Sequence, residues 1–282
     1  MTLTRPAARQ LLASRNLAPR RDLGQNFVVD PNTVRRIAHL ARVGPGDHVV
    51  EVGAGLGSLT LALAERGPDV LAVEVDPGLS AALRDVVADA ANVRVVTADA
   101  MALDWDDLLA GAAGWALVAN LPYNIASPLV ADLLDTVPAI ERMLVMVQRE
   151  VGVRLAAPPG SAAYGAISVK VAYWAQARVV GTVPAAVFLP RPNVESALVE
   201  IVRRPPPSVD PAHLFTLVRT GFGQRRKMLR RSLHDLVTPE QFGAAAVEPT
   251  DRPQDVGLDG WVRLAHATVS ERPGSTTALT AE

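Results

Sequence analysis

The sequence EVGAGLG at residues 51–57 joins an apolar run, His48–Gly53, to a segment with helical spacing that begins at Ser58. Glycines in such a turn adopt backbone conformations that other residues resist, and they let a ligand approach closely. The spacing G-x-G-x-G differs from the G-x-G-x-x-G that seats a pyrophosphate at a helix N-terminus. The acid Glu51 would also repel phosphates but would tolerate a cationic amino acid or a sulfonium. This turn therefore favours a cofactor without phosphates.

Apolar runs and helical segments alternate on both sides of this turn, which predicts an α/β fold with a parallel sheet covered on both faces. The expected strands are His48–Gly53, Val70–Val75, Val93–Thr97, Trp115–Asn120 and Met143–Gln148. The expected helices between them are Ser58–Arg66, Pro77–Asp89, Asp104–Leu109 and Pro128–Thr136, and two further helices, Thr4–Asn16 and Pro31–Val43, precede the sheet. Two later strands, Ile167–Ala175 and Ala197–Val202, are expected to close the sheet with an antiparallel edge.

Composition changes divide the chain into four predicted parts. Residues 1–22 form a basic helix or arm, and residues 23–204 form the sheet domain. The stiff sequence Pro205-Pro206-Pro207-Ser208 is a linker. Residues 208–268 have only helical patterns and form a small second domain, while residues 269–282 are expected to be a disordered tail.

Composition also limits the classes of protein that this chain can belong to. The 282 residues carry a net charge of −1 and no cysteine, which excludes disulfides and thiolate metal ligands and is consistent with a reducing cytoplasm. The five histidines are scattered, so we expect no metal site. No apolar run reaches the roughly 18 residues that a membrane span needs. The arginine-rich, acid-poor start also leaves a mitochondrial transit peptide open. No long heptad pattern indicates a dimer, so a monomer is expected.

Polar residues end successive predicted strands, where open α/β sheets bind ligands. Glu74 ends the second strand, in the position where an acid accepts hydrogen bonds from ribose hydroxyls; Asp76 is a competitor for that role. Asp99 ends the third strand and Asn120 ends the fourth. A nucleoside site without a phosphate cradle fits S-adenosylmethionine better than a dinucleotide.

The sequence Asn120-Leu121-Pro122-Tyr123 follows the fourth strand and suits an exocyclic amine on a flat ring. The Asn120 side-chain oxygen and the Leu121 carbonyl can each accept one amine hydrogen, and Pro122 fixes the backbone between them. Tyr123 offers a face for stacking. The same residues are also compatible with an ordinary turn. In the context of the cofactor motifs they indicate methylation of a nucleobase nitrogen, with Phe188 as the candidate for the other face of the base. A buried aromatic side chain under the sheet is the alternative explanation of Phe188.

The segment from Gly221 to Leu233 is basic and contains no acid, which is typical of phosphate binding. We expect Gln224–Arg231 to lie on a helix, where residues three and four apart share a face. The candidate RNA-binding residues are Arg225, Arg226, Lys227, Arg230 and Arg231. A solvated helix face is the alternative explanation.

These motifs together resemble the ribosomal RNA adenine dimethyltransferases, specifically the small-subunit enzymes whose loss gives kasugamycin resistance. The resemblance rests on Leu23-Gly24-Gln25-Asn26-Phe27, the 51–57 turn, Glu74, Asp99, Asn120 to Ile125, the pattern from Phe188 to Ser196 and the basic segment 221–230. It extends from about Pro6 to about Ala267. It implies a Rossmann-like class I S-adenosylmethionine-dependent methyltransferase with a mostly parallel seven-stranded sheet and a small C-terminal helical domain.

The resemblance also implies a substrate and a cofactor site. The substrate would be two adjacent adenosines in the hairpin loop near the 3′ end of 16S rRNA, in the small ribosomal subunit or its precursor, which receive four methyl groups at their exocyclic nitrogens. The cofactor would be S-adenosylmethionine. Its candidate contacts are Gln25, Asn26, Val28, Gly53, Gly55, Glu74, Asp99 and Asn120. Relatives usually have leucine in the position of Val28, so we expect a backbone contact there.

Three alternatives remain at this stage. The chain could dimethylate an adenine of the large-subunit RNA and confer macrolide resistance. It could act as an RNA-binding checkpoint of ribosome assembly, with incidental catalysis. It could also methylate a DNA adenine or a protein amide, although the basic C-terminal domain disfavours a protein substrate.

Overall fold

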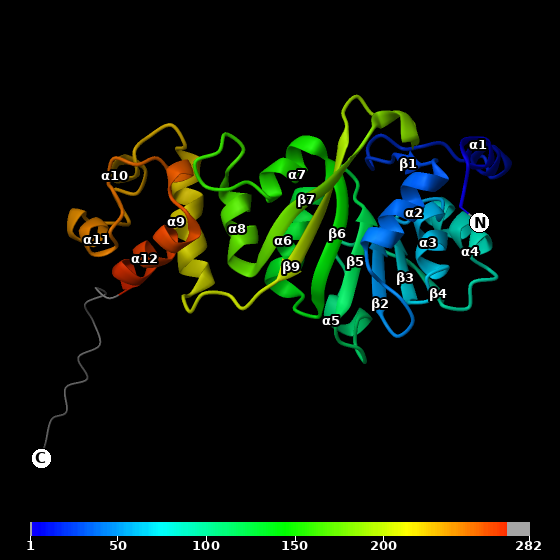
Figure 1. Ribbon diagram of the computed structural model, residues 1–282, viewed down its shortest axis with the longest axis horizontal. Helices are drawn as coiled ribbons and strands as arrows, with labels where there is room; N and C mark the ends of the chain where they lie inside the picture. The colour runs from blue at the N-terminus through cyan, green and yellow to red at the C-terminus, as the bar shows by residue number, and fades with distance from the viewer. Residues whose placement is uncertain (1, 270–282) are drawn as a thin grey trace, which may run out of the picture. The chain divides into compact units, whose positions relative to one another are not determined.

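The computed structural model describes residues 2–269 and contains a seven-stranded sheet with the order β4-β3-β2-β5-β6-β9-β7 (Figure 1). The parallel strands are β2 (His48–Val52), β3 (Asp69–Glu74), β4 (Val93–Thr97), β5 (Trp115–Asn120) and β6 (Ile140–Gln148). The strands β9 (Ser196–Arg203) and β7 (Ala175–Val183) complete one edge in antiparallel orientation. The predicted α/β class and mostly parallel sheet are confirmed.

The order of the parallel strands reverses between β2 and β5. The chain runs outward from β2 to β3 and β4, and then returns to pair β5 with the other side of β2. At such a point the two loops that follow the neighbouring strands separate, and a crevice opens at the carboxyl ends of the strands. This topology places the 51–57 turn beside the residues that follow Asn120.

Helices cover both faces of the sheet. On one face, α2 (Pro31–Leu40) and α3 (Ser58–Ala64) bury Val34, Ile37 and Leu63 against alternate residues of the central strands, in a cluster that includes Leu144 and Met146. On the other face lies α7 (Arg149–Leu155), whose Gly152 contacts Val147, Ala197 and Val199. The remaining helices of this part are α4 (Pro77–Val86), α5 (Trp105–Leu108) and α6 (Ala126–Thr136).

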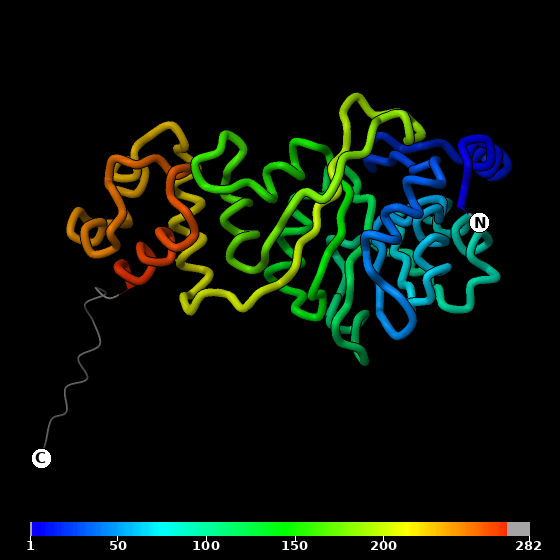
Figure 2. The backbone as a smooth tube through the Cα atoms, in the orientation of Figure 1, coloured from blue at the N-terminus to red at the C-terminus, as the bar shows by residue number. Residues whose placement is uncertain are grey.

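The N-terminal segment packs against the sheet domain through α1 (Arg5–Ser14). Ala8 and Leu12 of this helix share a cluster with Phe27 and Leu56. The Arg5 guanidinium donates to the carbonyls of Ala186 and Phe188, at 2.6 and 3.1 Å. A short pair of strands, β1 (Phe27–Val28) and β8 (Phe188–Leu189), joins the same two regions, which lie side by side in Figure 2.

The predicted strand Ile167–Ala175 is wrong. Residues Ala166–Trp174 form the helix α8, and the strand is β7, which begins where that helix ends. Alternating apolar residues in this segment are typical of a strand, but Tyr173 packs edge-on against Phe215 in a helical core, with ring centroids 5.3 Å apart. The edge strand β7 is exposed along much of its length, so it carries little apolar alternation.

The contacts divide the chain into two compact units. One unit contains residues 1–156 and 174–205, and the other contains residues 157–173 together with the chain from Pro206 onward. The sequence-based boundaries differ because they place residues 157–173 in the sheet domain. The second unit contains α9 (Pro211–Gly223), α10 (Leu229–Ser232), α11 (Pro239–Ala244) and α12 (Leu258–Val269), and Trp261 is fully buried in its core. The predicted tail lies outside the described residues, apart from residue 269, which ends α12.

None of the helices within residues 2–269 combines the length and the apolar character that crossing a membrane requires.

Candidate active site

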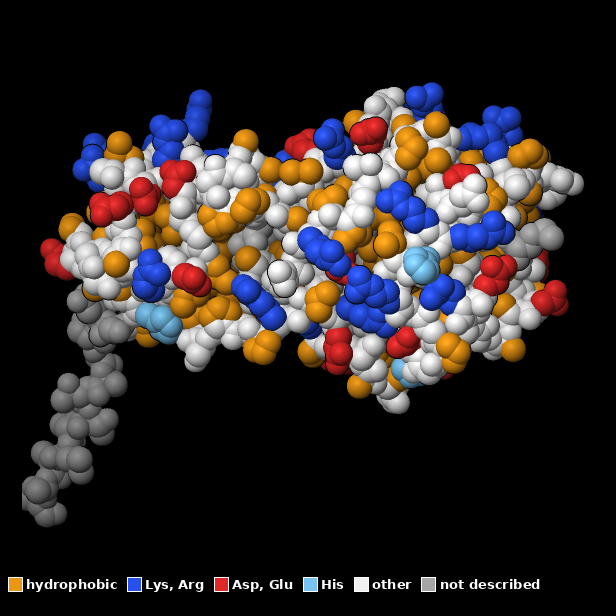
Figure 3. Space-filling model, in the orientation of Figure 1, with side chains coloured by type: hydrophobic (Ala, Val, Ile, Leu, Met, Phe, Trp, Pro, Cys, Tyr) orange, Lys and Arg blue, Asp and Glu red, His pale blue; other side chains and the backbone are white. Residues whose placement is uncertain are grey.

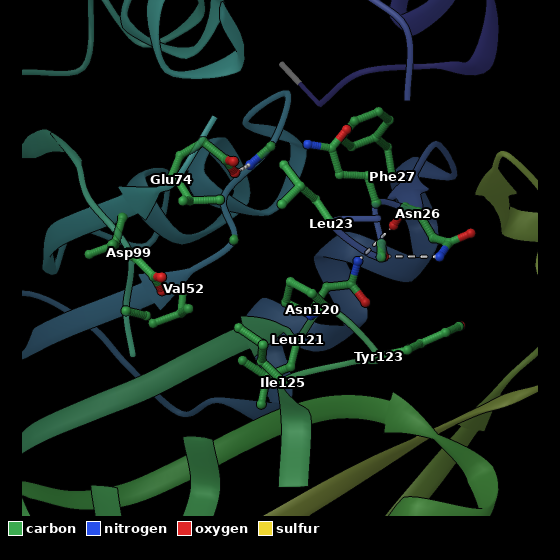
Figure 4. Close-up of a pocket in the computed structure, with 18 of the residues that line it drawn as sticks. Leu23, Asn26, Phe27, Val52, Glu74, Asp99, Asn120, Leu121, Tyr123 and Ile125 are labelled. Atoms are coloured by element: carbon green, nitrogen blue, oxygen red, sulfur yellow. Dashed lines mark hydrogen bonds between the residues drawn. The ribbon is translucent and has the colours of Figure 1, made fainter. Parts of the chain in front are cut away.

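A pocket lies at the carboxyl ends of β2, β3, β4 and β5 in the first unit (Figure 4). Glu74 and Asp99 lie on one side of the pocket, and Asn120 and Tyr123 lie on the other. The predicted site residues that line it are Gln25, Asn26, Gly53, Gly55, Glu74, Asp99, Asn120, Leu121, Pro122 and Tyr123. The structure therefore brings together residues from the first strand-to-helix turn, the N-terminal segment and the ends of three further strands.

The glycines of the 51–57 turn are required by both backbone conformation and space. Gly53 and Gly55 have φ values of 73° and 58°, in the region that L-residues with side chains rarely adopt. A Cβ atom at Gly53 would lie 3.2 Å from Pro122 Cδ, and one at Gly55 would lie 2.9 Å from Phe27 Cδ1. The turn thus fits closely against the two other segments that form the pocket.

Glu74 is held in place by backbone donors. Its side chain is 4% exposed, and its oxygens accept hydrogen bonds from the Gly55 N–H at 2.8 Å and from the Asp76 N–H at 3.0 Å. Burial raises the pKa of the Glu74 carboxyl, and the two backbone bonds oppose this effect. The competitor Asp76 does not line the pocket, because its carboxylate caps α4 by accepting from the backbone of Gly78 and Leu79.

Glu51 does not have the role that its place in the sequence suggests. It does not line the pocket; instead it is 2% exposed and accepts a hydrogen bond from the Thr60 hydroxyl at 2.6 Å. Burial raises the pKa of its carboxyl to about 8, which leaves it mostly protonated near neutral pH. Glu51 therefore contributes a buried polar group to the core rather than a negative charge to the pocket.

The Asn120 amide has a defined orientation. Its Nδ2 atom donates a 2.8 Å hydrogen bond to the backbone carbonyl of Asn26, so its oxygen is the atom left to face the pocket (Figure 4). Asn26 is itself fixed, since its side-chain amide donates to the Gly24 carbonyl at 3.1 Å. This pair of bonds fixes the amide, uses one of its two N–H donors and leaves its oxygen as the acceptor on the pocket side.

Leu121 and Tyr123 complete the polar side of the pocket. Leu121 N–H donates to the Met146 carbonyl of β6 at 3.0 Å, and this bond holds the peptide in place. Among residues 2–269, no donor is bonded to the Leu121 carbonyl. The Tyr123 hydroxyl lies 3.1 Å from the hydroxyl of Ser196, a fully buried residue at the start of β9. Burial raises the pKa of Tyr123, so this side chain stays neutral.

Two predicted site residues lie elsewhere. Val28 is 6% exposed and Phe188 is fully buried, and both pack in the hydrophobic cluster under α2 and α3. Neither residue lines the pocket. The pairing of β1 with β8 puts Val28 opposite Phe188, which turns both side chains into the core. In this structure Phe188 has no exposed face on which a base could stack.

The sequence analysis assigned no role to the apolar part of the pocket lining, which includes Leu23, Phe27, Val52, Val73, Val75, Ala98, Ala100 and Ile125. Val75 is the most informative of these residues because 43% of this large apolar side chain is exposed. Its position immediately after Glu74 is a signal that the sequence contains. An apolar surface beside an acid that can bind a ribose is suited to a purine ring.

The basic segment of the second unit does not form the single helix that the sequence predicts. The helix α9 ends at Gly223, residues 224–227 form a turn, and the short α10 begins at Leu229. The expected helix over Gln224–Arg231, with residues three and four apart on one face, is therefore wrong. Instead Lys227, Arg230, Arg231 and His234 line one open depression. Arg225 donates to the Ala162 carbonyl at 2.7 Å, within the same unit.

The pocket fits S-adenosylmethionine on structural grounds. It has a glycine turn without space for side chains, a buried carboxylate for ribose hydroxyls and an exposed valine beside it. Together with the mostly parallel seven-stranded sheet and its antiparallel edge, these features define a class I S-adenosylmethionine-dependent methyltransferase. The family model of the ribosomal RNA adenine dimethylases matches residues 16–264, and the chain belongs to that family.

Sequence relatives and solved structures agree with this assignment. The chain is 46% identical over 275 residues to the ribosomal RNA small subunit methyltransferase A of Thermobifida fusca, covering 93% of this chain and 95% of the relative. It is 41% identical over 271 residues to the protein of that name in Moorella thermoacetica, covering 90% and 94%. The crystal structure of the 23S rRNA methyltransferase ErmE aligns with a TM-score of 0.68 and 26% identity over 86% of this chain and 99% of ErmE. A dimethyladenosine transferase from Plasmodium falciparum shares the fold, with a TM-score of 0.69.

Proposed function

We propose that this protein dimethylates the exocyclic N6 atoms of two adjacent adenosines in the 3′-terminal hairpin loop of 16S rRNA, in the small ribosomal subunit or its precursor. Family membership and the small-subunit names of its relatives support this substrate. A bacterial substrate of this kind would place the protein in the cytoplasm. A monomeric state stays a prediction.

The observation that carries the proposal is a pair of acceptors at one edge of the pocket. The hydrogen bond from Asn120 Nδ2 to the Asn26 carbonyl leaves the Asn120 oxygen free, and the Leu121 carbonyl is the next acceptor along the chain. An adenine amine has two hydrogens, and each acceptor can take one of them. A base that carries a carbonyl at this position would bring acceptor to acceptor and would be rejected.

These two acceptors address the chemical difficulty of the reaction. The lone pair of the adenine amine is delocalised into the ring, so the amine is a poor nucleophile. In the first transfer, hydrogen bonds from both amine hydrogens to Asn120 and Leu121 would draw the nitrogen towards a tetrahedral geometry and localise that lone pair; in the second, the one remaining N–H can bond to one of these acceptors. Bound S-adenosylmethionine would supply a methyl group whose bond to sulfur breaks as the bond to nitrogen forms, with a neutral thioether as the leaving group and one amine proton lost to solvent in each transfer. The rest of the catalysis is alignment, which can contribute several kcal/mol.

The target base has to leave its stack before it can enter this pocket. Tyr123 supports a flipped base, because its ring lines the pocket and its hydroxyl is held by Ser196. Stacking on an aromatic ring contributes about 1–3 kcal/mol per base. Single-stranded loops offer such bases readily, which favours a hairpin loop over a duplex.

We also propose that the depression lined by Lys227, Arg230, Arg231 and His234 binds RNA phosphates. Arg225 and Arg226 lie in the adjacent exposed turn and would add to this surface. Phosphate contacts release counterions, so binding should weaken steeply as salt rises.

The test is methylation with labelled S-adenosylmethionine on three substrates: undermethylated 30S particles, 50S particles and naked 16S RNA. We expect label on adenines of the small-subunit particle, and about 100-fold slower labelling by the Asn120→Ala variant. Label on 50S particles alone would support dimethylation of the large-subunit RNA instead. A catalytically dead variant that still rescues ribosome maturation would support an assembly checkpoint as an additional role.

A further inference from the structure

We propose that the exposed face of α2, together with the neighbouring edge strand β7, is a second RNA-binding surface that contacts backbone phosphates beside the active site. We call it the α2 basic face and define it by Arg35, Arg36, His39, Arg42, Arg142 and Arg178. All six residues belong to the first unit. The inference rests on the proposed RNA substrate and adds a site to it.

Helical spacing separates the two faces of α2. Val34, Ile37, Ala38 and Ala41 are buried against the sheet, whereas Arg35, Arg36, His39 and Arg42 are exposed. Basic side chains gather over α2 and the strands beside it (Figure 3). A rise of about 1.5 Å per residue gives a basic strip about 6 Å long from Arg35 to His39, and Arg42 lies in the turn that follows α2.

Contacts with β7 and β9 extend this strip across the sheet edge. Arg36 lies over Gly181, where a Cβ atom would collide with the guanidinium, and it donates to the Thr182 carbonyl at 3.3 Å. Glu200 of β9 accepts from Arg178 at 2.6 Å, and Arg42 lies 3.9 Å from it. The side chain of Arg178 is 59% exposed and that of Arg42 is 70% exposed, while that of Glu200 is 18% exposed.

The charges on this face do not cancel. Glu200 offsets one of the two arginines that surround it, and Asp47 pairs with Arg142 at 3.3 Å. The guanidinium of Arg142 also donates to the Ala41 carbonyl at 2.7 Å, so that residue mainly holds the end of α2. Arg35, Arg36 and one arginine beside Glu200 remain as excess positive charge.

The chemistry of this face selects phosphates rather than bases. Residues 31–43 and 175–183 contain no Phe, Tyr or Trp, and the imidazole of His39 is the one aromatic ring among the six residues of the face. Arginine forms paired hydrogen bonds with phosphate oxygens. Such contacts fix the position of a nucleic acid without reading its sequence. The stem that carries a target loop presents this kind of backbone.

The helix that carries this face also begins, along the chain, just after a segment of the pocket lining. Asn26 and Phe27 line the pocket, and α2 starts only a few residues later, at Pro31. An RNA loop whose base enters the pocket would therefore have its flanking strand near Arg35. The surface would orient the stem while Asn120 and Leu121 hold the amine.

The test compares two pairs of substitutions that remove equal charge. Arg35→Gln/Arg42→Gln alters the α2 basic face. Arg84→Gln/Arg94→Gln alters exposed arginines of α4 and β4, near the opposite edge of the sheet. Binding of undermethylated 30S particles and of the isolated hairpin RNA is measured from about 50 to 200 mM salt. Cofactor affinity is measured by calorimetry.

We expect the first pair to bind both RNAs about tenfold more weakly and to lower the slope of log K against log salt by about 2, one unit for each arginine that no longer neutralises a phosphate. The control pair should match the wild type, and both pairs should keep wild-type cofactor affinity. Equal slopes for the two pairs would overturn the proposal. So would unchanged RNA binding with weakened binding to phosphatidylglycerol vesicles, which would identify a membrane surface.

The two proposals fail in different ways. Wild-type protein that binds 30S particles without methylating them refutes the proposed function and leaves the α2 basic face standing. Wild-type methylation, with unchanged RNA binding by the Arg35→Gln/Arg42→Gln pair, refutes only the second surface.

Discussion

The hydroxyl groups of Tyr123 and Ser196 lie 3.1 Å apart, and this contact joins the pocket to the buried start of β9. Ser196 is fully buried and pairs with Gln148 of β6 and Val183 of β7, so its position is set by the sheet. Tyr123 belongs to the loop after β5, outside the sheet. The sheet edge therefore orients the ring on which the target base would stack.

Replacing Ser196 with alanine should lower kcat for RNA about fivefold, the cost of about one hydrogen bond, because the Tyr123 ring loses its anchor. Cofactor affinity should not change. Tyr123→Phe removes the same bond from the other side, so the double variant should be no worse than either single variant. Ser80→Ala, at another fully buried serine, is the control. Additive losses in the double variant would exclude the positioning role.

Asn120→Ala should lower turnover about 100-fold, by analogy with the removal of one hydrogen-bonding group that stabilises a transition state. The alanine cannot accept an amine hydrogen, although the variant should still bind S-adenosylmethionine weakly. Single-turnover methylation of 30S particles and calorimetry with the cofactor measure the two effects. Wild-type rates would rule out the role of Asn120.

Glu51 should make stability depend on pH. Burial raises the pKa of its carboxyl in the folded protein to about 8, well above the ordinary value of 4.5. The folded state therefore holds a proton that the unfolded chain has released, and the free energy of unfolding should fall as pH rises from about 5 to 8. The loss is on the order of a few kcal/mol.

The variant Glu51→Gln removes this titration and keeps a polar group beside Thr60. Urea unfolding at pH 5.5 and 8.5 should therefore show a smaller loss of stability in the variant than in the wild type. The buried Glu74, whose pKa is also raised, stays in both proteins, so the comparison isolates Glu51. The same pH dependence in both proteins would contradict the raised pKa.

Phe188→Ala should destabilise the protein by about 3–5 kcal/mol, the usual cost of removing a large buried side chain. The ring is fully buried with Val34, Ile37 and Leu198. Val194→Ala, at a 45% exposed position in the same loop, should change stability by less than about 0.5 kcal/mol. If the Phe188→Ala protein had normal stability and lost only its methylation of RNA, Phe188 would instead be a residue of the active site.

The sequence predicted best those features that follow from the order of apolar and helical segments along the chain. Apolar runs separated by helical segments predict five central parallel strands, all of which are present. The carboxyl ends of parallel strands meet at one edge of a sheet, so strand order along the chain was enough to predict that the glycine turn, Glu74, Asp99 and Asn120 share one pocket.

Side-chain directions depended on contacts between distant segments. Val28 and Phe188 lie in motifs that resemble a cofactor site and a substrate site, yet the pairing of β1 with β8 turns both into the core. Glu51 precedes the glycine turn, but its side chain accepts a hydrogen bond from Thr60 of α3 and does not line the pocket. The segment α8 has the apolar alternation of a strand but forms a helix. Its Tyr173 packs against Phe215, about 40 positions further along the chain, in a helical core that local sequence does not reveal.

The sequence by itself determined the class of sheet, the edge at which the pocket forms and the residue types that meet there, because these depend on strand direction and local periodicity. Only the tertiary structure decided which end of the Asn120 amide faces the pocket, since that orientation depends on the bond from Asn120 to the Asn26 carbonyl, 94 positions away. The same reason applies to the α2 basic face, whose arginines come from α2, β6 and β7 and are gathered by folding alone.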